Sequence, residues 1–420
     1  MIYCQEHDRL PVSNPDAKYD RLKLAQWCRP ARSRDFGYYA SYRIGAEWID
    51  ENEALIVTTK RRMEHIDFLR MFMSCFTFEQ GAESFSSIYS IEEEQPLIKA
   101  PVFKGTVSQL IVIHFLSVVR RIKSLKKGYV HRCENLKKVK GHIHPLKNEM
   151  ANVMPRRLDR ICCNYMEYSE DIPENRLIKK ALLLSEQLLH RFRAPAILDL
   201  TIKKSLALFQ NVSANTTISE SDRSKKHKLF REYHEAVRLA RTILRHFDFT
   251  ISKPHNEEDK VPPFVIDMAR LYEHYVYGLL HEAYGKQIIY QYRGSTGIPD
   301  FLFRSEQFKA ILDTKYIPKY KDEALDKEVI RQLSGYGRDL SILKELGYND
   351  IHENSPTPSL PCIIIYPTEE KNAGNPFKGN SLESMCTHKE PHMSLFFKIE
   401  IPIPCLLYTS PSPRDGATSR

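Results

Sequence analysis

Residues 297–303 read Gly-Ile-Pro-Asp-Phe-Leu-Phe, and residues 310–316 read Ala-Ile-Leu-Asp-Thr-Lys-Tyr. Each stretch is a short apolar run that carries an acid, which is typical of a buried strand, and the polar residues between the two runs predict a turn. Side chains alternate between the two faces of a strand, so Asp313 and Lys315 point to the same side. The turn folds the strand that begins at Asp300 back beside them. We therefore expect two carboxylates and a lysine together at one edge of a β-sheet.

These residue types suit metal-dependent cleavage of a phosphodiester bond. Carboxylates bind a hard cation such as Mg²⁺, which polarises the phosphate and acidifies a water molecule, while a lysine stabilises or orients the attacking oxygen. The competing interpretation is an ordinary hairpin with solvent-facing polar residues, because such a string often arises by chance in a chain with 27% charged residues.

Two flanking patterns favour the functional interpretation. After residue 322 the pattern becomes helical and places Gln332 and Tyr336 four residues apart on one face, within reach of the strands or of DNA. Upstream, residues 268–280 predict an apolar helix in which Glu273 is embedded. Glu273 is either the exposed edge of that helix or a third acid of the site, and the pattern leaves both alternatives open.

The order of these residues resembles the PD-(D/E)xK nucleases, in the branch whose helix carries a Gln-x-x-x-Tyr motif. Residues 136–143 and 167–179 narrow the resemblance, because together they are similar to McrC, the nuclease subunit of the McrBC modified-cytosine restriction system. The similarity runs from about residue 136 to residue 367, and Pro-Glu-Asn-Arg at residues 173–176 is its most specific part. The N-terminal region has no residue-by-residue match.

The resemblance implies a role for each residue of the site. The implied ligands of Mg²⁺, or of Mn²⁺ in its place, are Asp300, Asp313, Glu273 and the backbone carbonyl of Thr314. Lys315 would stabilise charge at the scissile phosphate, and water would be the nucleophile. Gln332 and Tyr336 would position the DNA strand or brace the cluster.

The resemblance also implies a partner, a McrB-like AAA+ ring that hydrolyses GTP, recognises modified cytosine and moves DNA. In the family the N-terminal region engages that ring. This chain has no Gly-x-x-x-x-Gly-Lys-Ser/Thr loop, so we expect no GTP site in it. Two alternatives stay open: a stand-alone nuclease of repair or of another defence system, and a non-catalytic subunit that only activates a GTPase. The intact Asp300, Asp313 and Lys315 argue against the second.

Composition sets the wider limits. The 420 residues, 42% of them hydrophobic, can bury a large core and make two or three domains, and the net charge of +9 favours a polyanionic partner such as DNA. The N-terminus lacks a signal sequence, and the apolar run at residues 110–119 is short and contains His114, so we expect a buried helix and no membrane partner. Nine cysteines without a paired framework suit a cytoplasmic protein.

The chain reads as a multidomain α+β and α/β protein. Residues 1–125 predict an N-terminal α+β module, the candidate contact for the GTPase partner, and residues 126–255 predict a mainly helical region with the Pro-Glu-Asn-Arg segment. Residues 256–404 predict the PD-(D/E)xK domain, with a central mixed sheet flanked by helices. Residues 405–420 resemble the translated read-through of a sequencing-library adapter, so we expect the natural chain to depart from this sequence near Pro404. Further predicted strands are residues 53–59, 362–367 and 396–401, and further predicted helices are residues 63–76, 177–189 and 233–240.

Three weaker patterns have competing interpretations. Asn175 and Arg176 follow a predicted helix start, where a structural role is favoured over contact with the DNA backbone. Residues 126–140 are rich in lysine and arginine, which favours a solvated face over a dedicated DNA groove. A zinc site can be drawn from His131, Cys133, His142 and His144, but this spacing matches no common structural zinc site.

Overall fold

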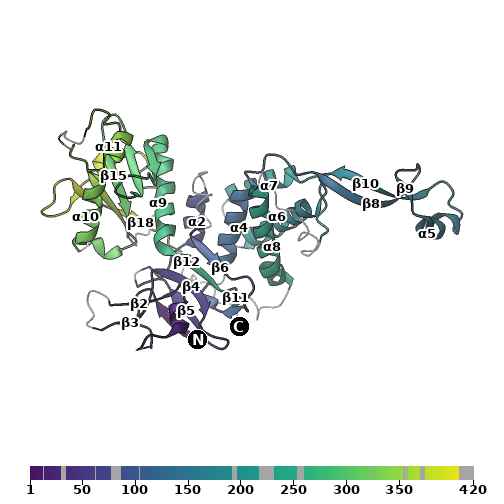
Figure 1. The fold of residues 1–420 in the computed structure, drawn as a ribbon, viewed down its shortest axis with the longest axis horizontal. Coiled ribbons are helices and arrows are strands. Elements are labelled where there is room, and N and C mark those ends of the chain that lie inside the picture. Colours follow the sequence, from purple (N-terminus) through teal and green to yellow (C-terminus); the bar gives the residue numbers. More distant parts are fainter. Residues whose placement is uncertain are drawn as a thin grey trace, which may run out of the picture. The chain divides into compact units, whose positions relative to one another are not determined.

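A computed structural model gives the fold of the chain in two compact units. It describes residues 1–12, 14–29, 35–61, 63–76, 87–103, 105–191, 196–216, 231–252, 260–321, 323–352, 356, 358–368 and 374–405. One unit combines Met1–Leu110 with Glu258–Arg420, and the other is Ile111–Glu257, so the second is inserted into the sequence of the first (Figure 1). Most of the stretch that resembles an adapter, residues 406–420, lies outside the described residues.

The N-terminal module is built on a five-stranded sheet that the first 125 residues do not complete. Its order is β1 (Ile2–Gln5), β5 (Ala54–Thr58), β4 (Arg43–Trp48), β12 (Phe264–Asp267) and β6 (Tyr89–Ile91). β1 and β5 are parallel, whereas β12 pairs antiparallel with both of its neighbours. β5 confirms the strand predicted at residues 53–59. β12 follows the inserted unit in the sequence. The sheet is therefore incomplete without residues from beyond that unit.

Smaller elements complete the module. They are α1 (Ala17–Asp20), the hairpin of β2 (Ala25–Cys28) and β3 (Gly37–Ala40), α2 (Phe68–Phe76), the pair of β7 (Ile98–Lys99) with β11 (Lys260–Val261), and a 3₁₀ turn, Pro101–Phe103. The helix predicted over residues 63–76 begins late, because Ile66 forms a β-bridge with Cys405 and Asp67 accepts the Arg70 N–H as a helix cap.

The inserted unit is a helical bundle with a long arm. Its helices are α4 (Thr106–Val119), α6 (Pro173–Arg191), α7 (Ala196–Leu208) and α8 (Arg231–Ser252). Residues 110–119 of α4 are buried, as predicted. The stretch Pro101–Val119 is long and apolar enough to cross a membrane by length and composition, but it is 76% buried inside the protein, as a core helix is. α6 begins at Pro173 and buries one apolar face, which confirms the amphipathic helix.

The expectation of a mainly helical middle region was wrong at its start. β8 (Gly128–Leu136) and β10 (Ile161–Ser169) form a nine-residue antiparallel pair, which extends from the bundle as an arm (Figure 1). At its far end lie β9 (His142–Ile143), α5 (Pro145–Asn148) and a π-helical turn, Glu149–Val153. Exposure along the first part of β8 alternates between neighbouring residues. That is the period of a strand, whereas a helix would repeat every 3.6 residues.

The C-terminal domain contains a six-stranded sheet with parallel and antiparallel pairs, which confirms the predicted central mixed sheet. Its order is β13 (Ile288–Tyr290), β14 (Phe301–Arg304), β15 (Lys309–Thr314), β16 (Cys362–Thr368), β18 (Phe396–Pro402) and β17 (His388–Lys389). β14 and β15 form the predicted hairpin, and β15, β16 and β18 are parallel. All seven residues of β16 are buried, which confirms the central strand.

Helices cover both faces of this sheet. α10 (Lys327–Tyr336) and α11 (Leu340–Glu345) pack on Leu302 and Ile311, whereas α9 (Met268–Tyr284) lies on the other face. There Tyr277 stacks on Phe301 with ring centroids 5.8 Å apart. Short turns Gly285–Gln287 and Pro318–Lys321 and helix α12 (Leu382–Met385) complete the domain. α9 follows β12 directly, and Asp267 caps it, so one continuous segment joins the N-terminal sheet to the C-terminal domain.

Candidate active site

Asp300 and Asp313 lie side by side at the ends of two strands. Phe301 pairs with Leu312, so the next position of the antiparallel register sets Asp300 opposite Asp313. Both the backbone N–H and the hydroxyl of Thr314 donate to Oδ2 of Asp300, over 2.7 and 2.6 Å. Burial raises the pKa of Asp300, although these bonds and Lys315 act in the opposite direction. The hairpin therefore delivers two acids to one corner of the sheet.

Lys315 supplies the positive charge of this corner. Its Nζ lies 2.6 Å from Oδ2 of Asp313, a carboxylate that is only 1% exposed. Burial and the neighbouring charge of Asp300 raise the pKa of Asp313 to about 7. Burial by itself would lower the pKa of Lys315, but the carboxylates of Asp313 and Asp300 raise it. The lysine is thus held protonated beside acids that repel each other.

Glu273 joins the same group from α9. Gln291 donates its side-chain N–H to Oε1 of Glu273 over 2.7 Å. Burial, and then the charge of Asp300, raise the pKa of Glu273 to about 7. An acid at a solvent-facing helix edge would not have its pKa raised in this way. Of the two alternatives that the sequence left open, the geometry favours a third acid in the cluster.

Gln332 and Tyr336 brace the loop that leads into Asp300. Gln332 donates to the Tyr336 hydroxyl over 2.8 Å, and that hydroxyl donates to the Ile298 carbonyl over 3.3 Å. Gly297 has φ +150°, and a Cβ there would lie 2.8 Å from Cε1 of Tyr336. Only glycine allows the backbone so close to the ring. Tyr336 is buried and belongs to the core cluster that α10 forms with the sheet.

Two residues that the sequence interpretation missed hold the same loops. Gln291 has φ +46°, an uncommon conformation for a side chain of this kind, and its N–H donates to the Asp300 carbonyl over 2.9 Å. Asp339 accepts from the N–H and hydroxyl of Thr296 and caps α11, and its pKa is lowered to about 2 because these bonds outweigh its burial. The cap pattern Asp-Leu-Ser could have identified Asp339, whereas no sequence signal distinguishes Gln291.

The donor set suits a hard divalent cation. The charges of Asp300, Asp313 and Glu273 act on one another, and a second positive charge beside Lys315 would relieve the repulsion that helps to raise their pKa values. Within the part of the chain that the structure describes, no three acid, histidine or cysteine side chains form a ready metal cage. Mg²⁺ does not require one, since it is usually held by one or two carboxylates, waters and substrate phosphates.

The zinc alternative finds no support. Cys133 and His142 flank Asn164 from opposite sides of β10, and His144 caps α5 through its ring. No metal-binding group of three such side chains occurs among the described residues. All nine cysteines are free thiols, and Cys162 and Cys163 are buried.

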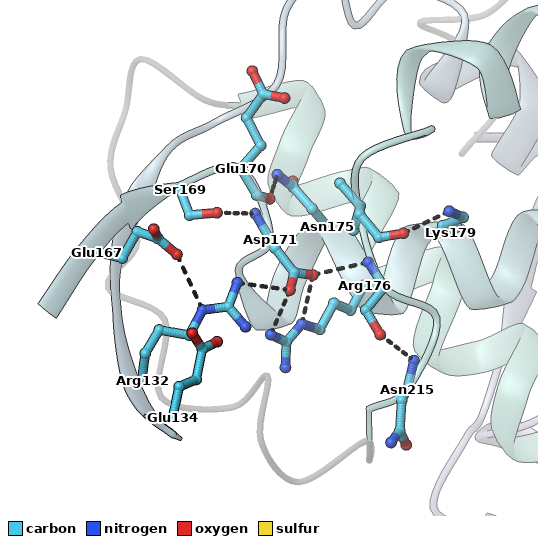
Figure 2. Close-up of polar contacts among 12 residues, drawn as sticks. Arg132, Glu134, Glu167, Ser169, Glu170, Asp171, Asn175, Arg176, Lys179 and Asn215 are labelled. Atoms are coloured by element: carbon cyan, nitrogen blue, oxygen red, sulfur yellow. Dashed lines mark hydrogen bonds and ion pairs between the residues drawn. The ribbon is translucent and has the colours of Figure 1, made fainter. Parts of the chain in front are cut away.

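The Pro-Glu-Asn-Arg segment forms a polar junction at the base of the arm (Figure 2). Asp171 lies at its centre and accepts two bonds of 2.8 Å from Arg176, one of 3.3 Å from Arg132 and one of 2.9 Å from the Ser213 N–H. Asn175 is fully buried and donates to two backbone carbonyls. These contacts support the structural interpretation of Asn175 and Arg176.

The lysine-rich stretch at residues 126–140 also behaves as a solvated surface. Lys137, Lys138 and Lys140 are exposed, and Lys140 pairs with Glu167 over 3.3 Å across the arm. At the base, Lys126 pairs with Glu174 over 3.2 Å. Several of these charges are therefore already matched by acids of the same unit.

Comparison with known proteins identifies one family. The model of the McrBC 5-methylcytosine restriction system component matches residues 90–338, more than half of the chain. The chain is similar to a solved half-complex of Thermococcus gammatolerans McrB AAA+ hexamers with bound McrC, at 15% identity and a TM-score of 0.39, covering 96% of this chain and 95% of that one. It is also similar to the cryo-EM structure of the Thermococcus gammatolerans McrBC complex, at 14% identity and a TM-score of 0.31, covering 66% and 86%. No curated protein matches the chain. Because both TM-scores are low, the family assignment rests on the family model.

Proposed function

The chain belongs to the family of McrBC 5-methylcytosine restriction system components, and from this premise we propose that it is the subunit that cuts DNA. The observation that carries the proposal is the corner formed by Asp300, Asp313 and Lys315. Two adjacent strands deliver two carboxylates and a protonated lysine to one point, and the loops around them are fixed by further hydrogen bonds.

Magnesium completes the proposed site. Asp300 and Asp313 would hold Mg²⁺, with Glu273 and the backbone carbonyl of Thr314 as further ligands and Mn²⁺ as a substitute. When bound, the ion would polarise the phosphate and lower the pKa of a water molecule. The raised pKa values of Glu273 and Asp313, which a neighbouring carboxylate helps to cause, support this assignment, because a cation would stabilise the ionised forms.

Lys315, Gln332 and Tyr336 would have separate roles in cleavage. The Lys315 ammonium would stabilise negative charge at the scissile phosphate, and it stays charged because the carboxylates raise its pKa. Gln332 and Tyr336 would act by bracing the loop before Asp300, since the Gln332 amide donates to the Tyr336 hydroxyl and that hydroxyl donates to the Ile298 carbonyl. Their position supports this role over direct contact of Tyr336 with the DNA strand.

A restriction system component of this family would act with a McrB-type AAA+ GTPase ring. We assign GTP hydrolysis and the recognition of modified cytosine to that ring, and cleavage to this chain. The net charge of +9 supports DNA as the substrate. A cytoplasmic location belongs to the same proposal. A stand-alone nuclease, or a subunit that only activates a GTPase, are the alternatives, and the intact acid–lysine corner weighs against the second.

The test compares wild type with Asp313→Ala on methylated and unmethylated plasmid, with Mg²⁺, and with or without a McrB-type GTPase and GTP. We expect wild type to cut methylated plasmid only in the complete mixture, and Asp313→Ala to cut at least about 100-fold more slowly. Glu306→Ala is the matched control, because this acid is exposed at the opposite end of the same hairpin.

Each departure from this result has a distinct meaning. Equal cleavage by wild type and Asp313→Ala would contradict the assignment of Asp313 to the cleavage site. Cleavage without GTP and the ring would favour the stand-alone nuclease. Stimulation of the GTPase without any cleavage would favour the non-catalytic activator.

A further inference from the structure

Lys60 connects the N-terminal module to the strand that carries the acid–lysine corner. It follows β5, and its ammonium donates to the Tyr316 carbonyl over 2.6 Å and lies 3.6 Å from the centroid of the Tyr316 ring. These two residues are 256 positions apart in the sequence. Tyr316 is the residue after Lys315, so the contact acts on the peptide next to the proposed catalytic lysine.

Two parallel strands place the groups that support Lys60. β1 and β5 are parallel neighbours, so their carboxyl ends lie at the same edge, where Glu6 follows one and Lys60 the other. Oε2 of Glu6 accepts the Lys60 backbone N–H over 3.0 Å. Glu6 is 4% exposed. Burial raises the pKa of Glu6, although the charge of Lys60 and the hydrogen bond from the Lys60 N–H act in the opposite direction.

This arrangement is a poor way to stabilise a fold. Burial lowers the pKa of Lys60 to about 8, although the charge of Glu6 counteracts this effect. Taking an ammonium and a carboxylate out of water costs free energy that their attraction rarely exceeds, and apolar residues of similar size often stabilise a protein more. What the Lys60 ammonium provides instead is a fixed geometry between two parts of the chain, through its contacts with Tyr316.

The backbone around Lys315 is held from three sides. Its N–H donates to the Ile365 carbonyl of β16 over 2.9 Å, and its carbonyl accepts from the Ile317 N–H over 2.7 Å. Lys60 holds the next carbonyl, that of Tyr316. The Tyr316 ring also faces Tyr272 of α9, with centroids 6.0 Å apart. The first two contacts come from the C-terminal domain itself, whereas the Lys60 contact comes from the N-terminal module.

We propose that Lys60 is a positioning residue for Lys315, through which the N-terminal module sets the geometry of the cleavage site. The inference rests on the proposed nuclease function and adds a regulator to that site. Lys60 acts through a hydrogen bond to the Tyr316 carbonyl and a cation–π contact with the Tyr316 ring, next to the proposed catalytic lysine. A shift of the carboxyl ends of β1 and β5 would move Lys315 relative to Asp313, and so change the cleavage step without touching DNA.

The experiment uses the full chain with a McrB-type GTPase, GTP and methylated DNA, and compares Lys60→Met, Lys60→Arg and wild type. Methionine keeps the length of the side chain but cannot donate, and arginine keeps a charge and donors. We expect Lys60→Met to lower the single-turnover cleavage rate constant about 10- to 100-fold, because displacements near 1 Å have effects of this size. The KM for DNA and the Mg²⁺ concentration for half-maximal rate should not change, and Lys60→Arg should recover part of the rate.

Lys309→Met is the matched control. Lys309 begins the same strand at its far end, and its Nζ lies 4.1 Å from the centroid of the Tyr348 ring. The control removes a similar lysine–tyrosine contact from the same domain and should cleave as wild type does. Thermal unfolding of all variants shows whether each is folded.

The outcomes separate this inference from the function on which it rests. A folded Lys60→Met that cleaves at the wild-type rate would overturn the positioning role while leaving the nuclease assignment intact. The positioning role would also be overturned if Lys309→Met lowered the cleavage rate constant as much as Lys60→Met does. The same holds if the fall in cleavage by Lys60→Met is fully explained by a smaller fraction of folded protein. Absence of cleavage by wild type itself would instead remove the proposed function.

Discussion

Asp313, Asp300 and Glu273 share one buried corner, and each has its pKa raised there. For Asp313 and Glu273 the values are about 7, well above their ordinary range, because burial and mutual repulsion penalise the ionised form. Such groups add stability at pH values below their unfolded pKa and lose that contribution as the pH rises through the folded value. Without metal, the protein should therefore lose stability from this corner between about pH 4 and pH 7.

The measurement is thermal unfolding of metal-free wild type and Asp313→Asn across this range. Asn carries no charge, so the stability of wild type relative to the variant should fall as the pH rises, by a few kcal/mol, since one pKa unit corresponds to about 1.4 kcal/mol. Adding Mg²⁺ at pH 8 should raise the thermal stability of wild type and leave that of the variant unchanged. A pH-independent difference between the two proteins would contradict the prediction.

Gly297 provides a second test at this scale. With φ +150° and a Cβ position only 2.8 Å from the Tyr336 ring, Gly297→Ala must displace the loop that leads into Asp300. We expect a loss of about 1–3 kcal/mol in the free energy of unfolding and a fall in cleavage of about 10-fold or more. Gly374→Ala is the control, because no atom lies within 4 Å of its Cβ position. Normal cleavage by Gly297→Ala would show that the loop does not fix Asp300.

Some residues of the corner could be predicted from the sequence, and others could not. Asp300, Asp313 and Lys315 could be grouped because they lie on two strands joined by a short turn, where register follows from the turn. Their chemical roles stay predictions. Gln291 and Lys60 could not be found, since one acts through an unusual backbone conformation and the other through a contact 256 residues away.

Among the elements, the base of the arm depends on one carboxylate. Asp171 accepts from two arginines and a backbone N–H, and these bonds outweigh burial and lower its pKa. Asp171→Asn should lower the free energy of unfolding of the inserted unit by about 1.5–3 kcal/mol, the usual contribution of hydrogen bonds to a charged group. Hydrogen exchange at the β10 amides, together with denaturant unfolding, measures the loss.

Asp159→Asn is the comparison for this prediction. Its carboxylate pairs with Arg160 over 3.7 Å, and both side chains are exposed. Surface pairs of this kind contribute about 0–1 kcal/mol. Equal effects of the two substitutions would mean that the junction in Figure 2 does not secure the arm.

Element prediction succeeded where one face of an element is buried. β16 and α6 carry long apolar patterns, and both were located within a few residues. β8 and β10 were missed because no residue of β8 is fully buried and the buried positions of β10 gather in its first half, so the apolar alternation that reveals a strand is weak. Polar pairs across the two strands, such as Arg132 with Glu167, add nothing to the periodic pattern of apolar residues from which a strand is predicted.

At the scale of the whole molecule, the two segments of the first unit depend on each other. β6 pairs with β12 and β12 with β4, so a chain ending at residue 125 lacks the strand between them. We expect residues 1–125 alone to aggregate through these unpaired edges. A shortened chain in which a Gly-Ser linker replaces residues 106–259 should fold, because β7 and β11 bring the two cut ends together.

Circular dichroism melting and gel filtration of both shortened chains test this expectation. The joined chain should unfold in one cooperative transition and elute as a discrete species. Cooperative unfolding of residues 1–125 by themselves would contradict the role of β12.

Strand β12 also imposes an order on protein synthesis. β4 leaves the ribosome about 200 residues before β12 does, and at roughly 5–20 residues per second the nascent sheet waits about 10–40 seconds for its missing strand. The inserted helices and arm are complete during that interval. A strand from the second half of the chain therefore finishes the first part to emerge, and a ribosome that stalls before residue 264 exposes an unfinished sheet to the chaperones of the cell.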